Sequence, residues 1–301
     1  MLVLEWNIRL LSLVPAILKA RMAGLRVIVW GHGFSKHESP IKAFFRRSAA
    51  RLAHGVMFYN RGTAERHVRS HGFDPSRVYV AINSLDQRPI AGARERCVAE
   101  PDGVRALRDE HRIDGPLILY VSRLLEENRA ELLFDALVVL RERFPGVTVA
   151  IIGAGPDEER LRNEAGAKGV AEHVRFLGKI YGEDRLSWWF SASDVFCYPQ
   201  NIGLAMMHAM GYGVPVVTSD SPDLHGPEIE ALVNGENGLL YKHGDGADLA
   251  EKLAAILSDP DLRARMSEAA LETVRERFSL DRMVDGYEAA VRGSAPVDSF
   301  R

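Results

Sequence analysis

The chain has 301 residues, a length that suits two domains with sizeable cores. Its 47% hydrophobic and 26% charged residues are typical of a globular, soluble protein, and no apolar run reaches the roughly 18 residues of a membrane span. The net charge of only −3 argues against a nucleic-acid binder, but residues 1–110 carry 18 Lys and Arg against 10 Asp and Glu, and the remainder 20 against 31. The basic front half is therefore expected to face something anionic.

The cysteines and the N-terminal segment bear on the cellular compartment. Cys97 and Cys197 lie far apart, which is typical of a reducing compartment and predicts no metal site. The apolar run from Leu10 to Leu18 is followed by Lys19 and Arg21, where a signal peptide would have a small-residue cleavage site. We therefore predict an amphipathic helix here and a cytoplasmic protein.

Strands and helices alternate from the start of the front half. The predicted strands cover residues 2–6, 25–30, 56–59 and 78–82. The predicted helices cover residues 8–23, 42–54 and 63–71. This βα alternation predicts a parallel, doubly wound sheet. Because the chain opens on a strand with no Gly-rich first loop, we expect the later part of a domain whose opening units are absent.

The back half is predicted to be a fuller α/β domain. Its predicted strands cover residues 117–121, 147–152, 174–177, 195–198, 214–218 and 239–241. Its predicted helices cover residues 129–144, 184–192, 204–212, 247–257, 260–278 and 280–291. The polar segment 91–102 is interpreted as the boundary region. We therefore predict an N-terminal domain over 1–110, a C-terminal domain over 111–280, and a C-terminal helix and tail over 281–301 that pack back toward the first domain.

The segment from Phe196 to Asp220 predicts a strand, a tight turn, a helix and a second strand in close succession. Gly203 lets the backbone approach a ligand, and the helix that begins at Leu204 presents unpaired N–H groups and the positive end of its dipole. The pattern predicts an anion site. An ordinary strand-turn-helix-strand crossover without a ligand is the alternative.

Three further motifs follow predicted strands, where ligands bind in open parallel sheets. Arg123 has a guanidinium that can hold phosphate with two hydrogen bonds, and a salt-bridged arginine at a helix start is the alternative. The run Gly153-Ala154-Gly155-Pro156 matches the dinucleotide-binding fingerprint poorly, because Glu158 stands where the third glycine should be. His32 lies between two glycines, either as a site residue or as a structural loop histidine.

The sequence shows no Ser/His/Asp triad, Walker loop, metal-ligand spacing or pair of carboxylates at strand ends. What remains is a phosphate site in the back half and a histidine in the front half, expected to face each other across a cleft. Without a metal, a leaving diphosphate would be neutralised by arginine and a helix end, so no metal and no cofactor are expected.

Several motifs between Leu117 and about Leu257 resemble, in order and spacing, the donor-binding domain of family 4 retaining glycosyltransferases. Besides the segment from Phe196, they are YVSRLLEENRAELLFDAL, IIGAGPDEERL, VRFLGKI, PEIEALVNGENGLLY and DPDLRARM. The resemblance implies an α/β fold of the GT-B class, in which two Rossmann-like, doubly wound parallel-sheet domains face each other across a cleft. In the front half, VIVWGHG and VYVAINSLD resemble the later part of the family's acceptor domain. The N-terminal domain is therefore expected to be incomplete.

The resemblance implies a set of positions for the donor diphosphate. Arg123 matches the arginine that holds the diphosphate, and Gly203 and Leu204 match the backbone amides beside it. The family's lysine partner falls on Asn128, so one cation is lost. Arg129 is adjacent, but one helical step would turn its side chain about 100° away.

The resemblance also implies a set of positions for the sugar and the ribose. The family's two glutamates, eight positions apart, fall on Gln200 and His208, which is typical of a branch in which both are replaced. The first normally binds sugar hydroxyls and the second the ribose diol, and Gln and His can still accept and donate hydrogen bonds. Asn201 and Ile202 complete this implied set, and Glu230 matches a further family glutamate.

The function that the resemblance implies is a retaining, metal-independent glycosyltransferase of bacterial cell-surface polysaccharide biosynthesis. His32 matches the acceptor-domain histidine near the reacting sugar and is the implied catalytic residue. The implied partners are a nucleotide-sugar donor and a glycan or glycolipid acceptor, with no nucleic acid. A peripheral contact with the inner face of the cell membrane is expected, with a solvated basic helix as the alternative, through Lys42, Arg46, Arg47 and Arg51 beside Phe44 and Phe45.

Two other functions stay open at this point. A non-catalytic or truncated GT-B protein that acts as a binding or assembly partner is favoured by the altered donor positions. A nucleotide-sugar epimerase of related fold would need a pair of acid/base carboxylates, for which the matching motif positions offer no candidates.

Overall fold

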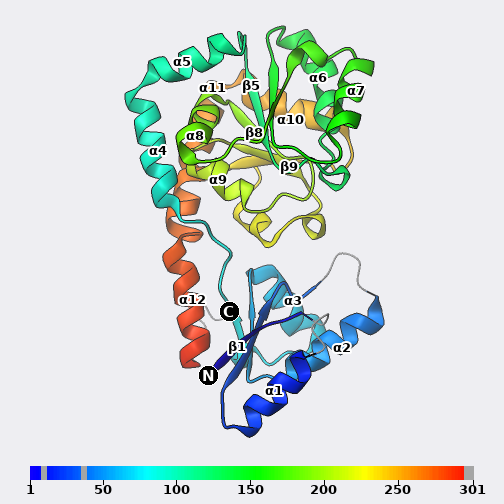
Figure 1. Ribbon diagram of the computed structural model, residues 1–301, viewed down its shortest axis with the longest axis vertical. Coiled ribbons are helices and arrows are strands. Elements are labelled where there is room, and N and C mark those ends of the chain that lie inside the picture. Colours follow the sequence, from blue (N-terminus) through cyan, green and yellow to red (C-terminus); the bar gives the residue numbers. More distant parts are fainter. Residues whose placement is uncertain (8–11, 35–38, 295–301) are drawn as a thin grey trace. The chain divides into compact units, whose positions relative to one another are not determined.

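The computed structural model describes residues 1–7, 12–34 and 39–294 of the chain. It divides into two compact units, each built around its own parallel β-sheet (Figure 1). The first unit combines Met1–Ser84 with Phe278–Arg301, and the second comprises Leu85–Arg277. Within the described residues, no helix has both the length and the apolar composition that a membrane crossing requires.

The sheet of the first unit has its strands in chain order, all parallel. They are β1 (Leu2–Glu5), β2 (Val27–Gly31), β3 (Gly55–Phe58) and β4 (Val78–Val80). The helices of this unit are α1 (Leu13–Met22), α2 (Pro40–Arg51), α3 (Arg61–His71), the 3-10 turn η1 (Pro75–Arg77) and α12 (Leu280–Arg292). The predicted strand and helix alternation is confirmed, although residues 8–11 of the first predicted helix lie outside the described residues.

This sheet is covered on both faces, which explains why its strands are almost continuously apolar. Successive side chains of a strand alternate between the faces. Val27 and Val29 therefore join a core with residues of α1, whereas Ile28 packs with residues of α12. Figure 1 shows α12 on one side of the sheet and α1, α2 and α3 on the other.

The helix α12 belongs to the first unit although the second unit precedes it in the chain. It approaches β4 so closely that a Cβ atom at Gly286 would overlap the carbonyl oxygen of Val80. Only glycine lacks that atom, so the contact depends on Gly286. The Ser84 hydroxyl adds a hydrogen bond to the Phe278 carbonyl (2.6 Å) where the two chain segments of this unit meet.

One of the basic residues expected at the surface of α2 points inward instead. Arg46 is buried, its guanidinium lies 5.0 Å from the centre of the Trp6 ring, and it donates to the carbonyl of Gly33. Helix periodicity explains the difference, since Arg46 shares its face with the buried Ala49 and Ala50. The exposed basic face of α2 is therefore smaller than the sequence suggested.

The core of the first unit contains a histidine that should make stability depend on pH. Burial beside Trp6, Phe58 and Phe73 lowers the pKa of His67 from its ordinary value of 6.5 to about 4. The His67 imidazole therefore takes up a proton near pH 6.5 in the unfolded chain but only near pH 4 in the folded chain. Stability should be complete above pH 6.5 and fall by up to about 3 kcal/mol as the pH drops to 4.

The measurement is the free energy of unfolding between pH 4 and 7.5, from urea titrations. His67→Gln, which stays neutral, should remove most of this pH dependence, whereas His243→Gln at an exposed position should leave it unchanged. An identical pH profile for the native chain and His67→Gln would show that the buried imidazole is not responsible.

The second unit has a six-stranded parallel sheet in the order β10-β9-β8-β5-β6-β7. Its strands are β5 (Leu117–Val121), β6 (Thr148–Ile152), β7 (Val174–Gly178), β8 (Val195–Cys197), β9 (Val216–Ser219) and β10 (Gly238–Tyr241). Its α-helices are α4 (Gln87–Ala99), α5 (Pro101–Glu110), α6 (Leu132–Arg143), α7 (Glu158–Ala167), α8 (Glu183–Ala192), α9 (Ala205–Gly211), α10 (Gly246–Ser258) and α11 (Pro260–Glu272). Shorter turns are η2 (Glu126–Asn128), η3 (Ala171–His173), η4 (Pro222–Leu224), η5 (Pro227–Ala231) and the π-helical η6 (Thr273–Arg277).

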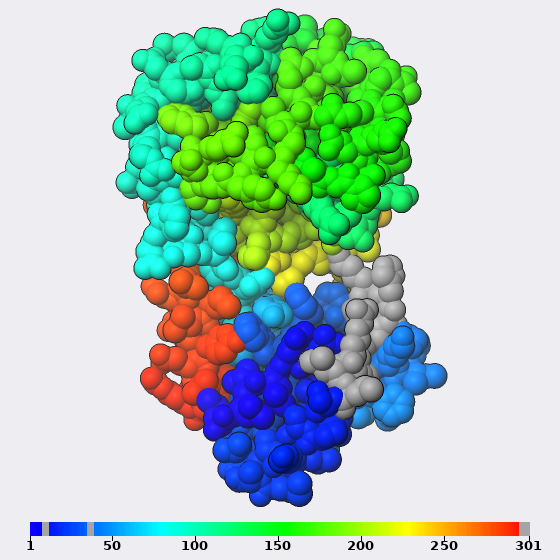
Figure 2. Space-filling view, in the orientation of Figure 1, coloured from blue at the N-terminus to red at the C-terminus, as the bar shows by residue number. Residues whose placement is uncertain are grey.

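The segment interpreted as a domain boundary is helical and belongs to the second unit. Ile90, Ala93 and Cys97 recur at helical spacing on α4 and are buried, and α4 packs on α8 and α9. Pro101 starts a new helix at its first position rather than a loop. Figure 2 shows α4 and α5 (cyan) beside α8 (yellow-green) on one face. The second unit therefore begins at Leu85, not at residue 111.

Candidate functional site

The order of strands in the second sheet reverses between β5 and β8. The chain runs from β5 outward to β6 and β7, then returns to β8 and runs the other way to β9 and β10. Ligands of open α/β sheets bind at such a switch point, because the loops at the carboxyl ends of the two strands diverge there. The loop after β5 carries Arg123, and the loop after β8 carries Gln200 and Gly203. The fold thus brings the predicted donor residues onto neighbouring loops.

Hydrogen bonds hold these two loops together. The Ser122 hydroxyl and the Tyr198 phenol are 2.6 Å apart, and the Gln200 carboxamide donates to the carbonyl of Glu127 (3.1 Å). Burial raises the pKa of Tyr198, so its phenol stays protonated at neutral pH. Gln200 therefore contacts the loop after β5.

Asn128 connects both loops from a buried position. Its Nδ2 donates to the carbonyl of Arg123 (2.8 Å) and to the hydroxyl of Ser122 (3.3 Å). Its Oδ1 accepts from Nδ2 of Asn201 (2.9 Å), a residue in the left-handed conformation with a φ of 68°. The Asn128 carboxamide is thus engaged with protein groups and fixes the backbone that presents Arg123.

Asn128→Ala should loosen this junction. The substitution removes three hydrogen bonds made by a buried carboxamide, which should lower the free energy of unfolding by about 1 to 3 kcal/mol. Chemical denaturation checks this value against Asn163→Ala, an exposed asparagine of α7. Equal stabilities for the two variants would contradict the bridging role of Asn128.

Arg123 is exposed at this edge of the sheet. Among the residues that the structure describes, none accepts a hydrogen bond from its guanidinium. Its loop is nevertheless rigidly placed, since Cβ atoms at Gly153 and Gly155 would overlap the carbonyl oxygens of Ser122 and Leu124. These two glycines therefore serve close packing of the loops after β5 and β6. The arginine is left with its hydrogen-bond donors available to an anion.

The turn before α9 is fixed by a histidine that sequence reasoning missed. The N–H of Ile202 donates to Nδ1 of His225 (3.2 Å), and the other ring nitrogen lies 3.0 Å from the Ser219 carbonyl. Since a carbonyl only accepts, the proton is on Nε2. His225 is buried and ties the turn that contains Gly203 to the end of β9. Leu204, just before α9, is exposed.

A second residue missed from the sequence is Glu228, in η5. An added Cβ atom at Gly203 would meet its Oε2 at 3.6 Å, and the side chain is buried. Glu230, two residues later, is the glutamate that the motif comparison selected, and it is only partly buried. The sequence feature that could have indicated Glu228 is the Gly226-Pro227 turn after β9, because this turn brings the next residue back toward the turn at Gly203.

His208, on α9, pairs with a carboxylate from a different helix. Its Nε2 lies 2.9 Å from Oε1 and 3.0 Å from Oε2 of Glu183, at the start of α8. The phenol of Tyr212 donates to the same carboxylate (2.5 Å). Glu183 thus places a carboxylate beside His208. The sequence gives no hint of this pair, since 25 positions separate its members.

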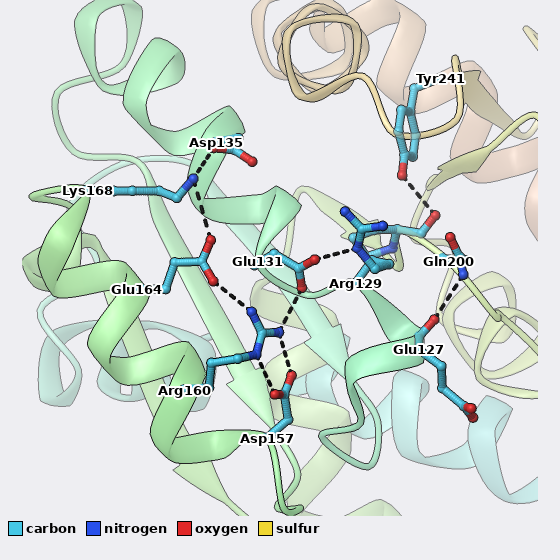
Figure 3. Close-up of polar contacts among 11 residues, drawn as sticks. Glu127, Arg129, Glu131, Asp135, Asp157, Arg160, Glu164, Lys168, Gln200 and Tyr241 are labelled. Carbon is cyan, nitrogen blue, oxygen red and sulfur yellow. Dashed lines mark hydrogen bonds and ion pairs between the residues drawn. The ribbon is translucent and has the colours of Figure 1, made fainter.

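A network of ion pairs connects Arg129 and Glu131, which follow the loop after β5, with α7 (Figure 3). Arg160 of α7 contacts Asp157 (2.6 Å), Glu164 (2.8 Å) and Glu131 (3.1 Å), and Glu131 in turn pairs with Arg129. Arg129 has a φ of 54° and lies outside any regular helix, so the expected 100° helical step does not apply to it. Its guanidinium is committed to Glu131.

In the first unit, His32 follows β2 at the carboxyl end of the sheet. It is exposed, and its ring centre lies 4.5 Å from that of Tyr59, which follows β3. Gly33 has a φ of 72°, and a Cβ atom there would strike Phe58 and Thr63, so this glycine sets the course of the loop. His32 is therefore presented at a strand end, as the sequence predicted.

In the described part of the chain, no group of three or more His, Cys, Asp or Glu side chains is placed to hold a metal ion.

Known proteins resemble this chain along most of its length. A phosphatidyl-myo-inositol mannosyltransferase of Mycobacterium leprae is 38% identical over 166 residues, which is 54% of this chain and 42% of that protein. A GDP-mannose-dependent alpha-(1-6)-phosphatidylinositol monomannoside mannosyltransferase of Mycolicibacterium smegmatis is 30% identical over 264 residues, or 83% of this chain and 66% of that protein. The chain thus spans less than two thirds of the length of either relative.

Solved structures show the same fold. Anabaena Alr3699/HepE in complex with UDP superposes with a TM-score of 0.78 at 20% identity, over 93% of this chain and 76% of that chain. A glycosyltransferase from Rickettsia africae gives a TM-score of 0.68 at 14% identity, over 94% and 81%. The predicted α/β class, with two Rossmann-like parallel-sheet domains of the GT-B type, is confirmed. A family model described as glycosyl transferases group 1 matches residues 104–273, more than half of the chain, which therefore belongs to this family.

Proposed function

We propose that this chain transfers a sugar from a nucleotide-diphosphate sugar to a cell-surface glycan or a lipid-linked glycan acceptor, with retention of configuration. The observation that carries the proposal is the exposed guanidinium of Arg123, which has no protein partner among the described residues and lies at the switch point of the second sheet. A guanidinium in this position is suited to two hydrogen bonds with a diphosphate.

In the proposed reaction, the bond between the anomeric carbon and the diphosphate oxygen breaks. A new bond forms from that carbon to the acceptor oxygen on the same face, and the acceptor proton passes to the leaving diphosphate. Arg123 and the backbone amides at Gly203 and Leu204 stabilise the charge on the leaving group. The proposal includes no metal ion or cofactor. Beside Gly203 lies the buried carboxylate of Glu228.

The remaining predicted site residues have distinct roles in this proposal. Asn128 positions the Arg123 loop rather than contacting phosphate, because its carboxamide is engaged with protein groups. Gln200, Asn201 and the backbone of Ile202 are assigned to the transferred sugar, since the Ile202 side chain is fully buried. His32 of the first unit stabilises the positively charged anomeric centre.

The names of the relatives support donor and acceptor classes. Two of them are described as mannosyltransferases of phosphatidylinositol compounds, one of them GDP-mannose-dependent, and the Anabaena protein was solved with UDP. We propose a nucleoside-diphosphate sugar as donor and a lipid-linked glycan as acceptor. A cytoplasmic location, at the inner face of the cell membrane, suits such an acceptor.

A peripheral membrane contact through α2 is part of this proposal. Ile41, Phe44 and Phe45 are 69%, 58% and 60% exposed, and they share the helix surface with Lys42 and Arg47. Apolar side chains flanked by cations suit the interface of an anionic bilayer. Sedimentation with phosphatidylglycerol vesicles tests this: the double variant Phe44→Ser/Phe45→Ser should lose binding, and equal binding by both proteins would exclude this contact.

Calorimetric titration with UDP- and GDP-sugars tests the donor class. Turnover on a lipid-linked acceptor, with the product anomer assigned by NMR, then tests the reaction and its stereochemistry. Failure to bind any common sugar nucleotide at millimolar concentration would overturn the proposal. Binding without transfer or hydrolysis would instead favour a non-catalytic GT-B protein.

A further inference from the structure

Glu183 is held by its neighbours in one orientation. Two groups approach its carboxylate, the imidazole of His208 at 2.9 Å and the phenol of Tyr212 at 2.5 Å. Since a carboxylate only accepts hydrogen bonds, both neighbours donate to it. Burial, followed by the hydrogen bond to Glu183, raises the pKa of Tyr212, so the phenol stays a donor. This arrangement fixes the carboxylate, and its oxygens can still accept further hydrogen bonds.

The rings that hold Glu183 are themselves fixed by packing. Phe190 stacks on Tyr212 with an angle of 4° between the ring planes and a centre distance of 4.9 Å. The ring of His208 lies 4.8 Å from Phe190. Rings packed in this way have few alternative rotamers, so their donors point steadily at the carboxylate. The Glu183 side chain itself is 29% exposed and can be reached by a ligand.

The position of this carboxylate places it at the carboxyl edge of the second sheet. Glu183 starts α8 after the loop that follows β7, and Gly182 reaches it with a φ of 85°. His208 is one helical turn from Leu204, since its N–H donates to the Leu204 carbonyl (3.1 Å). Helical side chains lean toward the N-terminus, so the imidazole and its carboxylate partner lie beside the first turn of α9.

Glu183 differs from three other carboxylates at this edge, because two donors fix its orientation while its side chain stays partly exposed. Glu127 accepts from Asn201 (3.3 Å), and Asp220 accepts from the backbone of His243 (2.9 Å). Glu228 is almost fully buried. A carboxylate with free acceptor sites and partial exposure is suited to two adjacent hydroxyl groups, each of which donates one hydrogen bond. In a nucleoside diphosphate, the ribose carries such a diol on the far side of the phosphates.

We infer that Glu183 binds the ribose hydroxyls of the nucleotide and that His208 and Tyr212 are its positioning residues. The inference rests on the proposed function, because it needs a nucleoside diphosphate at the loops after β5 and β8. It assigns the specificity for a ribonucleotide to α8, a helix that none of the sequence motifs singled out.

The test compares binding of a nucleoside diphosphate with its 2′-deoxy and 3′-deoxy analogues. The native chain should bind the ribonucleotide about 10- to 100-fold more tightly than at least one analogue. Glu183→Gln should weaken ribonucleotide binding by a similar factor and abolish the discrimination. Tyr212→Phe should reduce the discrimination between the ribonucleotide and its deoxy analogues. Asp184→Asn, at an exposed position in the same turn of α8, should leave this discrimination unchanged.

Thermal unfolding of each variant separates loss of binding from loss of fold. If Glu183→Gln is unstable, Tyr212→Phe replaces it in the discrimination test. If the native chain binds no nucleoside diphosphate, the proposed function fails. If it binds one but Glu183→Gln retains the discrimination, only this inference fails. Weakened binding of the sugar nucleotide with unchanged binding of the nucleoside diphosphate would overturn it too, because Glu183 would then contact the transferred sugar.

Discussion

Arg123→Ala is expected to lower kcat/KM for the sugar nucleotide by about 100- to 1,000-fold, the range seen when one preorganised donor to a developing anion is removed. The guanidinium is exposed and has no protein partner among the described residues, so its removal should leave the fold intact. Arg123→Lys should recover part of the loss, because an ammonium keeps the charge but not the planar pair of donors. Steady-state kinetics with varied donor concentration measure both variants.

The matched control is Arg265→Ala, at an exposed arginine of α11 on the same unit. This variant also loses one positive charge, but at a position far along the chain from the switch-point loops. Any general weakening of the electrostatic attraction of the anionic donor should therefore be the same in both variants. If Arg123→Ala and Arg265→Ala have the same kcat/KM, the diphosphate does not bind at Arg123 and the proposed mechanism is wrong.

Gly153→Ala is expected to lower the free energy of unfolding by about 3 to 5 kcal/mol. Gly153 has a φ of 140°, which L side chains rarely adopt, and its new Cβ atom would overlap the carbonyl oxygen of Ser122. Because that carbonyl belongs to the backbone, no side-chain rotation relieves the clash, and the loop after β5 must move. Since this loop carries Arg123, donor affinity should fall in the same variant. Urea denaturation and calorimetric titration measure the two effects.

Gly166→Ala provides the comparison for this substitution. Gly166 lies in α7 with open space around its Cα, and alanine is favoured over glycine in a helix by up to about 1 kcal/mol. The control should therefore be as stable as the native chain or slightly more so. Equal stability of the two variants would show that the loops after β5 and β6 are not in rigid contact.

The strands of both sheets followed from the sequence because their physical signal is local. Short apolar runs such as Leu117–Val121, which follows Gly115-Pro116 and is too short for a typical helix, favour buried strands, and the intervening amphipathic segments favour parallel crossovers. The helices α4 and α5 were not predicted because α4 buries only Ile90, Ala93 and Cys97 among many charged residues, and no residue of α5 is buried. Their helical state depends on packing against α8, which lies about 90 positions later in the chain.

The candidate site was predictable to the extent that it lies at strand ends. Arg123 and Gly203 follow directly from the positions of β5 and β8, whereas Gln200 was implied only by the family resemblance. His225 and Glu183 did not, because each acts through a contact with a distant loop or helix that no spacing in the sequence reveals. The role of Asn128 also depends on tertiary contacts, since its identity alone does not indicate that the carboxamide faces protein rather than ligand.

The assignment of α12 to the first unit has a consequence for synthesis on the ribosome. The strands β1 to β4 emerge long before α12, so the sheet face formed by Ile28, Met57 and Tyr79 is covered only when α12 has left the exit tunnel. The whole second unit is translated in the interval and can complete its own core first. Until then the nascent chain exposes an apolar sheet surface, which makes premature termination or slow translation near residue 280 a route to aggregation and chaperone capture.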